Sequence, residues 1–171
     1  MPLTIFKRWV EMASFKTQLT DFLDEKMISY RVKYHSKPVF TSEDAAVERG
    51  VRLSQIVKTM LLADGNNALA AVLPSHKRLD LKKLKKLSGH KNLQFMDKAS
   101  IVQKTGLIVG AVAPIGRVLE RMRIFVDPAL FDEEFLDTSS GDPNAGLELH
   151  RDALKALLKE AVFAPITKEE K

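Results

Sequence analysis

Apolar residues recur along this chain at two different spacings, which predict a mixture of helices and strands. Spacings of three and four residues indicate helices, whereas alternation at every second residue indicates strands. Because strands and helices interleave without a regular βα repeat, we expect a mixed α+β fold. The expected helices are residues 14–27, 41–50, 80–89, 98–104 and 152–162. The expected strands are residues 30–35, 55–63, 68–73, 93–96, 123–126, 135–138 and 146–150.

Three of the expected helices carry an apolar stripe that should face the core. Asp80 is a suitable N-cap for the third helix, and Gly89 is a suitable residue just past its end. The stretch 64–67, Asp-Gly-Asn-Asn, predicts a turn that joins strands 55–63 and 68–73 as an antiparallel hairpin. The stripes consist of Phe15, Leu19, Phe22, Leu23 and Met27 in the first helix, Leu81, Leu84 and Leu87 in the third, and Leu154, Leu157, Leu158 and Val162 in the last.

The chain is expected to form one domain with short additions at both ends. A length of 171 residues suits a single domain with a substantial core, and no linker or internal repeat divides it. Residues 1–13 are interpreted as an N-terminal extension, in which Trp9 and its apolar neighbours have the spacing of a short helix. Residues 14–163 then form the folded domain, and residues 164–171 form a polar tail.

Lys58 lies in the middle of an otherwise apolar strand, Gln55–Ala63. Ile56 and Met60 share its face of the strand, Thr59 lies on the other face, and neither face has the composition of a solvated surface. A lysine in this position either reaches water along its aliphatic stem at the rim of the sheet or presents its ammonium to a pocket. The strand by itself leaves both interpretations open.

A second unusual stretch is Gly106–Gly116, which reads Gly-Leu-Ile-Val-Gly-Ala-Val-Ala-Pro-Ile-Gly. Three glycines and a proline interrupt an apolar run that contains no polar side chain. Glycine permits positive φ and close backbone approach, so the segment can bend with its amide N–H groups turned towards a ligand. The alternative is a buried strand followed by a tight turn.

Together these stretches resemble the YbaK and prolyl-tRNA-synthetase-associated domain family, whose members include free-standing aminoacyl-tRNA deacylases. The resemblance covers roughly residues 15–162 and implies a curved, barrel-like mixed β-sheet surrounded by helices. The matching segments, in chain order, are Phe40–Ala46, Gln55–Thr59, Leu79–Leu84, Thr105–Gly106, Gly110–Pro114 and Ser140–Gly141.

The resemblance implies roles for individual residues. Lys58 would hold the terminal phosphate or the ester oxygen of an aminoacyl-tRNA, and the backbone around Gly110 would bind the aminoacyl carbonyl, so these two are the implied catalytic residues. Phe40 would look onto the substrate, although it can equally serve as a hydrophobic staple for the helix that follows it. The implied substrate-binding residues are Phe40, Thr59, Met60, Ala111, Val112, Ala113, Pro114, Ser140 and Gly141.

Positive charge is concentrated in one part of the sequence. The formal net charge is +5 and the isoelectric point is near 9.4, which suits a polyanionic partner. Between Lys77 and Lys91 the only acid is Asp80, and Arg117, Arg121 and Arg123 follow later as a possible extension of the same surface. On the third helix, the candidate contacts to a tRNA backbone are Lys82, Lys83, Lys85 and Lys86, with an ordinary solvated face as the alternative.

Several classes of protein are excluded by composition. The chain contains no cysteine, and its four histidines lack the spacing of metal ligands, so we expect no metal. The sequence also lacks a GxGxxG motif and a P-loop, so we expect no nucleotide cofactor. No apolar run has the length of a membrane span and no signal peptide is recognisable, so we expect a cytoplasmic protein without a membrane partner.

These observations lead to one predicted function with two alternatives. The predicted function is a trans-editing hydrolase that deacylates mischarged tRNA, with prolyl-tRNA synthetase as an expected partner. The predicted substrate is proline tRNA carrying cysteine or alanine, and serine esters on other tRNAs stay open. Because no Ser-His-Asp pattern and no paired carboxylates are visible, a water or the ribose hydroxyl would be the nucleophile. One alternative is a catalytically silent module that binds the acceptor end of tRNA or a synthetase. The other is an enzyme that forms a Schiff base on Lys58.

Overall fold

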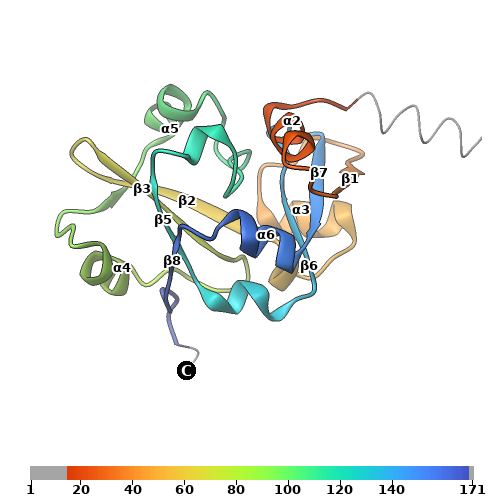
Figure 1. Ribbon diagram of the computed structural model, residues 1–171. Helices are drawn as coiled ribbons and strands as arrows, with labels where there is room; N and C mark the ends of the chain where they lie inside the picture. The colour runs from red at the N-terminus through yellow and green to blue at the C-terminus, as the bar shows by residue number, and fades with distance from the viewer. Residues whose placement is uncertain (1–14, 170–171) are drawn as a thin grey trace, which may run out of the picture.

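The computed structural model describes residues 15–169, which form five α-helices and eight strands (Figure 1). The N-terminal extension expected at residues 1–13 lies outside the described residues. The helices are α2 (Gln18–Glu25), α3 (Ser42–Arg49), α4 (Leu81–Ser88), α5 (Lys98–Thr105) and α6 (Arg151–Leu157). The strands are β1 (Arg31–Tyr34), β2 (Val57–Asp64), β3 (Asn67–Pro74), β4 (Gln94–Phe95), β5 (Arg123–Val126), β6 (Phe135–Ser139), β7 (Ala145–His150) and β8 (Val162–Phe163).

The described strands form two sheets rather than one closed barrel. The three-stranded sheet has the order β1-β7-β6 and is antiparallel, and the five-stranded sheet has the order β4-β2-β3-β5-β8 and is mixed. A single parallel bridge between Ile56 and Asp137 joins the start of β2 to β6. The expected α+β class is therefore confirmed, and the expected barrel-like sheet is an open pair of sheets that meet at the start of β2.

Both faces of the five-stranded sheet are covered, which explains why β2 is apolar on both sides. On one face Leu84 of α4 packs with Leu62 and Phe125, and all three side chains are fully buried. On the other face Ile101 of α5 packs with Leu61 in a separate buried cluster. The hairpin of β2 and β3 is confirmed, with Asp64 and Asn67 paired across its turn, and Asp80 and Gly89 cap α4 as expected.

The helical stripes were predicted wrongly at three positions. Met27 is 91% exposed, because α2 begins at Gln18 behind the Thr17 cap and the chain has already left the helix at Met27, where φ is +55°. Leu87 is 41% exposed, because α4 meets the sheet along a narrow stripe centred on Leu84. Val162 belongs to β8 rather than to the last helix, which ends at Leu157, because the edge of β5 is open to a parallel partner.

The packed structure continues beyond the boundary expected at residue 163. Ile166 is fully buried, and Thr167 forms a bridge with Leu79. The buried carboxylate of Asp127 accepts hydrogen bonds from the backbone N–H groups of both Ile166 and Thr167, at 2.9 and 3.0 Å. Of the tail expected at residues 164–171, the part up to Thr167 is thus held by the fold.

Candidate functional site

A small cavity of about 80 Å³ lies where the two sheets meet. The start of β2 forms one wall, the N-terminal end of α3 a second, and the loop at Gly110 a third. We refer to it as the Lys58 cavity. Its lining residues are Val39, Phe40, Thr41, Ser42, Ala45, Arg49, Ile56, Val57, Lys58, Thr59, Gly110, Val112 and Ser139.

Lys58 lines this cavity with a partly buried side chain. Its Nζ donates a hydrogen bond to the carbonyl of Lys77 at 3.1 Å, which leaves other donors of the ammonium for a ligand. Burial lowers the pKa of Lys58, the nearby charge of Arg78 lowers it further, and Glu43 acts in the opposite direction. An anionic ligand would compensate the water that this ammonium has lost.

Thr59 contributes a hydroxyl that has no protein partner. Its Oγ1 is buried and forms no hydrogen bond with any described residue. A buried polar group without a partner costs about 1 to 3 kcal/mol, so such groups are uncommon unless a ligand or water satisfies them. Because Thr59 also lines the Lys58 cavity, a bound ligand is a suitable partner.

Gly110 holds its loop directly against the backbone of Phe40. Its φ is +88°, and a Cβ at this position would lie 2.7 Å from the carbonyl oxygen of Phe40. Both the conformation and the contact therefore require glycine. The carbonyl of Gly110 also accepts a hydrogen bond of 2.6 Å from Ser139 Oγ, which ties the loop to the end of β6.

The serine that reaches the cavity is Ser139 and not the expected Ser140. Ser140 is fully buried, and its Oγ donates to the carbonyl of Ala145 at 2.6 Å and accepts from the N–H of Asp142 at 3.1 Å. These bonds hold the turn before β7. Alternation along β6 could have separated the two serines, since neighbouring strand residues point to opposite faces.

Five of the residues singled out from the sequence meet at the Lys58 cavity, namely Phe40, Lys58, Thr59, Gly110 and Val112. The others lie elsewhere. Met60 packs in the core beneath α4. A separate cavity of about 290 Å³ is lined by four of them, Ala111, Ala113, Ser140 and Gly141.

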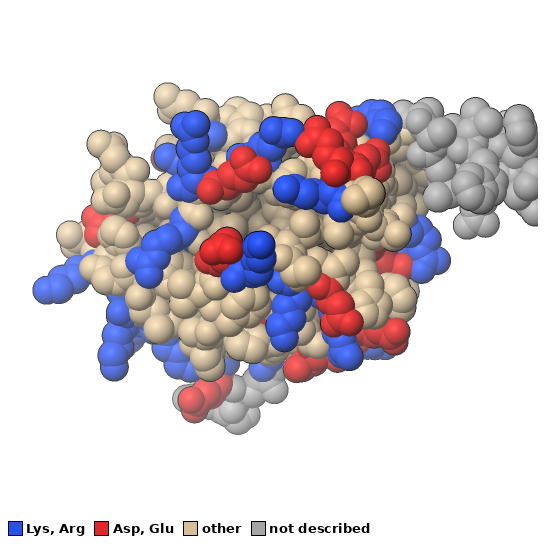
Figure 2. Space-filling model, in the orientation of Figure 1, with Lys and Arg blue, Asp and Glu red and all other residues tan. Residues whose placement is uncertain are grey.

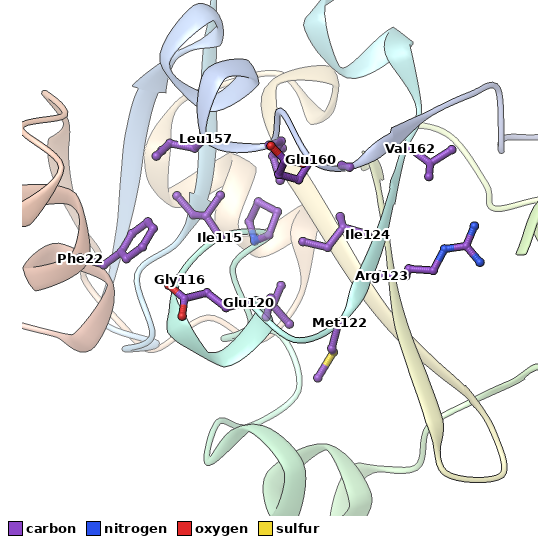
Figure 3. Close-up of a pocket in the computed structure, with 14 residues that line it drawn as sticks. Phe22, Ile115, Gly116, Glu120, Met122, Arg123, Ile124, Leu157, Glu160 and Val162 are labelled. Atoms are coloured by element: carbon purple, nitrogen blue, oxygen red, sulfur yellow. The ribbon is translucent and has the colours of Figure 1, made fainter.

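Pro114 lies at a third cavity of about 340 Å³ between α2, α6 and β5. Figure 3 shows that its labelled lining is mainly apolar, with Phe22, Ile115 and Ile124 around it. This cavity is larger than the Lys58 cavity, but its lining includes no lysine and no hydroxyl side chain. Its charged lining residues are Glu120, Arg123 and Glu160, so it lacks the combination of a lysine and hydroxyls that lines the Lys58 cavity.

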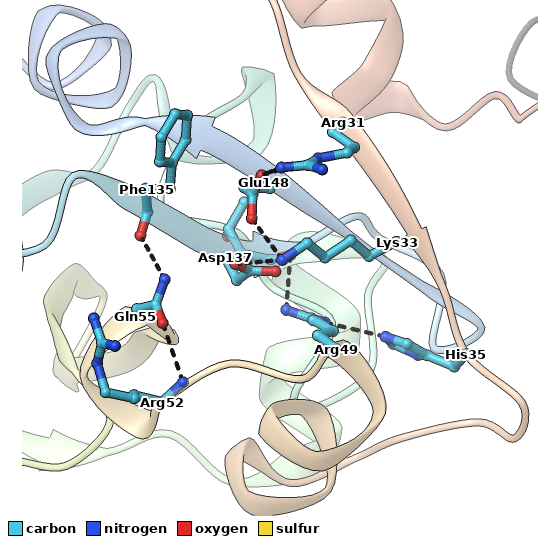
Figure 4. A network of polar contacts seen from close by, with 10 residues as sticks. Arg31, Lys33, His35, Arg49, Arg52, Gln55, Phe135, Asp137 and Glu148 are labelled. Carbon is cyan, nitrogen blue, oxygen red and sulfur yellow. Dashed lines mark hydrogen bonds and ion pairs between the residues drawn. The ribbon is translucent and has the colours of Figure 1, made fainter.

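Arg49 is a second cation of the Lys58 cavity, and sequence reasoning missed it. Its Nε donates to His35 Nε2 at 3.1 Å, and its Nη1 donates to the carbonyl of Thr138 at 3.3 Å (Figure 4). His35 is therefore held with its Nδ1–H donating to the carbonyl of Pro143. Gly146 leaves room for the guanidinium, because a Cβ there would overlap it. No local pattern marks such a residue, since its partners are distant in sequence.

Next to Arg49 lies a network of charges that crosses the three-stranded sheet, in which Asp137 and Glu148 are buried and Arg31 is exposed (Figure 4). Lys33 Nζ lies 3.3 Å from Asp137 Oδ2 and 2.5 Å from Glu148 Oε2, and Arg31 also pairs with Glu148. Burial raises the pKa of Asp137, against the opposing effect of Lys33. Burial also disfavours the charged form of Glu148, but hydrogen bonds from Lys33 and Arg31 bring its pKa below the usual range. This network fixes β1, β6 and β7 behind the cavity.

The basic residues of α4 lie outside the cavity. Lys82 and Lys86 are exposed and Lys85 is partly exposed, whereas Lys83 donates to the carbonyl of Thr167 at 3.0 Å. Among residues 15–169, no helix is long and apolar enough to cross a bilayer. The same residues contain no cluster of three or more His, Cys, Asp or Glu side chains arranged to hold a metal ion.

Comparison with known proteins places this geometry in context. The family described as the aminoacyl-tRNA editing domain matches residues 36–157. A protein of Enterococcus faecalis named "Putative Cys-tRNA(Pro)/Cys-tRNA(Cys) deacylase EbsC" is 27% identical over 93% of this chain and 100% of its own length. The proline–tRNA ligase of Desulforamulus reducens is 32% identical over 51% of this chain, but the match covers only 15% of that ligase.

Solved structures give the same fold. The crystal structure of hypothetical protein APE2540 has a TM-score of 0.80 and 28% identity, over 89% of this chain and 100% of that chain. The structure titled "Crystal structure of a putative trans-editing enzyme for prolyl tRNA synthetase" has a TM-score of 0.77 over 91% of this chain and 100% of that one. Because the identity is 22%, this match shows a shared fold and no more.

Proposed function

Because the chain belongs to the aminoacyl-tRNA editing domain family, we propose that it is a trans-editing hydrolase that deacylates mischarged tRNA. The substrate we propose is proline tRNA carrying cysteine or alanine. Support for cysteine on proline tRNA comes from the name of the Enterococcus faecalis relative, which this chain matches over that protein's full length. Partial matches to proline–tRNA ligases make prolyl-tRNA synthetase the proposed partner, in the cytoplasm where tRNA is charged.

The observation that carries the proposal is the convergence of Lys58, Thr59 and Gly110 on one cavity. An aminoacyl ester is already reactive, so hydrolysis needs orientation of the ester and stabilisation of the developing oxyanion rather than a strong nucleophile. The lining residues include a lysine, an arginine and several hydroxyls, but no histidine and no carboxylate that could act as a general base for a serine. A water or the neighbouring ribose hydroxyl is therefore the proposed nucleophile.

We assign the roles as follows. The Lys58 ammonium holds the terminal phosphate or the ester oxygen, where its partly desolvated charge interacts strongly with an anion. The backbone at Gly110 holds the aminoacyl carbonyl, with the loop kept in place by Ser139. The free hydroxyl of Thr59 supplies a further hydrogen bond to the substrate.

Selection of the amino acid would depend on the size of the cavity. Phe40 and Val112 provide its apolar walls, and its volume of about 80 Å³ suits a small side chain better than a large one. A substrate with extra methylene groups would overlap these walls, and overlap in a packed site costs about 1 to 3 kcal/mol. Ala111 and Ala113, which lie behind the loop, would act on specificity through the position of the loop backbone.

The test is deacylation of proline, alanine and threonine tRNAs charged with cysteine, alanine, serine or their cognate residues. We expect the wild-type protein to hydrolyse one mischarged species, and Lys58→Ala to reduce that rate by about 100-fold or more. Lys159→Ala, which changes an exposed lysine in the turn after α6, serves as the control and should keep the wild-type rate. Binding without hydrolysis of any species would instead support the silent tRNA-binding module.

A further inference from the structure

Basic side chains form a track that leads from the Lys58 cavity to the opposite end of the five-stranded sheet. Strand β2 runs from Lys58 at the cavity to Asp64 at the hairpin turn, a separation of six residues or about 20 Å. Helix α4 runs in the same direction, because Lys77 before the helix accepts a hydrogen bond from Lys58 Nζ and Asn92 after it donates to Asp64 at 3.3 Å. Figure 2 shows Lys and Arg side chains at the lower left, where Figure 1 places α4.

The track ends in a groove of about 490 Å³ beside the β2–β3 turn. We call it the hairpin groove. Its polar lining comes from the hairpin, the segment after α4, the end of α5 and the start of β5. The polar lining residues are Asn66, Asn67, His90, Lys104, Arg121 and Arg123.

The positive charge of this groove is largely unneutralised. Lys104 and Arg121 are exposed and have no carboxylate within ion-pair distance among residues 15–169. Arg123 donates to the carbonyl of Ser88 at 3.2 Å and lies 4.9 Å above the Phe125 ring, contacts that fix its guanidinium without cancelling its charge. The Asp64 carboxylate lies near the groove, 3.6 Å from the lining residue His90.

The track between cavity and groove contains few competing acids, of which Glu169 lies 3.9 Å from Lys83. Asp80 is the only acid between Lys77 and Lys91, and its Oδ1 is occupied by the backbone N–H groups of Lys82 and Lys83 at the start of α4. A continuous positive surface of this kind fits a chain of phosphates, which gains affinity through release of counterions. Asparagine side chains and arginines at its end are typical donors to phosphate and sugar oxygens.

We propose that the hairpin groove binds the phosphate backbone of the double-stranded acceptor stem of the tRNA whose 3′ end occupies the Lys58 cavity. This inference rests on the proposed function. The separation of about 20 Å between cavity and groove corresponds to the single-stranded 3′ segment that lies between the esterified ribose and the duplex, and this segment passes along α4. The groove thus selects a tRNA by its stem, whereas the cavity selects the ester.

The experiment compares two substrates that carry the same aminoacyl ester, a full-length tRNA and a short oligonucleotide that ends in CCA and has no duplex. In the double variant Lys104→Glu/Arg121→Glu, we expect kcat/KM for the tRNA to fall roughly tenfold or more, through KM, and its dependence on salt to weaken. Hydrolysis of the short oligonucleotide should stay at the wild-type rate. The matched control is Lys26→Glu/Lys159→Glu, which changes charge equally outside the groove and should behave as wild type on both substrates.

Three other outcomes would overturn the inference. Unchanged kinetics on the tRNA would show that the groove does not contact RNA, and an equal loss on both substrates would show that the variant disturbs the Lys58 cavity. Loss of binding to vesicles of anionic lipid, without loss on tRNA, would assign the groove to a membrane surface. If the wild-type protein hydrolyses neither substrate, the proposed function fails, and a weaker dissociation constant of the double variant for an uncharged acceptor-stem hairpin still tests the groove by itself.

Discussion

Two polar sites at the same end of the five-stranded sheet, on either side of β3, differ in how completely the protein satisfies them. Asp127, just after β5, is 3% exposed, and its carboxylate accepts four hydrogen bonds, from Ala129, from Ile166 and from the backbone and hydroxyl of Thr167. Thr59, in the Lys58 cavity, buries a hydroxyl that no described residue contacts. Asp127 therefore uses its full capacity inside the fold, whereas Thr59 keeps its capacity for something outside it.

The difference separates a group that holds the structure together from a group prepared for a ligand. At Asp127 the hydrogen bonds outweigh burial, and the pKa of the carboxyl is lowered. At Lys58 burial prevails, and the pKa of the ammonium is lowered, which disfavours its charged form. A fold that leaves charge and a hydroxyl undercompensated in one place loses stability there, and a bound anion would restore it.

The largest effect on stability is expected at Asp127. Asp127→Ala leaves four donors without an acceptor, three of them buried, and should lower the free energy of unfolding by about 3 kcal/mol or more. Urea denaturation measures this loss, with Asp132→Ala, an exposed acid of the same turn, as the control. At a temperature where the variant is folded, deacylation should continue, because Asp127 does not line the Lys58 cavity. A loss of less than 1 kcal/mol would contradict a structural role for Asp127.

The same carboxylate predicts a dependence of stability on acid. Because the pKa of Asp127 is lower in the folded protein than in the unfolded chain, the unfolded chain binds the proton more readily. The stabilisation is complete above the unfolded pKa of about 3.9 and is lost as the pH falls below it, through the folded pKa. Denaturation midpoints measured from pH 7 to pH 3 should fall more steeply for the wild type than for Asp127→Asn. Parallel curves would show that other carboxylates dominate acid unfolding.

The elements that were predicted correctly are those specified by neighbours in sequence. The hairpin turn at Asp64–Asn67 and the caps of α4 at Asp80 and Gly89 depend on local conformational preferences, and they formed as expected. The family was predicted correctly for a related reason, since its motifs are short runs such as Gln55–Thr59. Sequence reasoning thus found the strand that carries Lys58 and the loop that carries Gly110.

Features that depend on distant partners were not predictable in this way. The two sheets are joined by the bridge of Ile56 to Asp137, 81 residues apart in sequence. Arg49 reaches the cavity only because His35 and Thr138 lie beside it in the folded chain. Local periodicity contains no information about such contacts, because it reports which face a residue occupies and not what that face meets.

The role of the Lys58 cavity can also be tested at Gly110, where the position of the backbone rather than a side chain is at stake. Gly110→Ala combines an unfavourable φ of +88° with a Cβ only 2.7 Å from the carbonyl of Phe40, so the loop must move away from the cavity. We expect a loss of about 1 to 3 kcal/mol in stability and a fall in the deacylation rate of roughly tenfold or more. Gly106→Ala is the matched control, because its φ is +70° but no atom lies within 4 Å of the added Cβ. It should lose about 1 kcal/mol and keep its activity. Equal activity losses in the two variants would mean that the loop backbone has no special position.

The smallest expected effect is also the sharpest test of the contrast between the two sites. Thr59→Val removes a buried hydroxyl that has no partner, so the free energy of unfolding should stay within about 1 kcal/mol of the wild type or rise. Thr167→Val makes the same chemical change but removes a hydrogen bond to a carboxylate, and it should lower stability by about 1.5 kcal/mol or more. Deacylation should respond in the opposite order, with KM raised by Thr59→Val and unchanged by Thr167→Val. If both variants lost the same stability, Thr59 would have a structural partner, and its hydroxyl would no longer be available to a substrate.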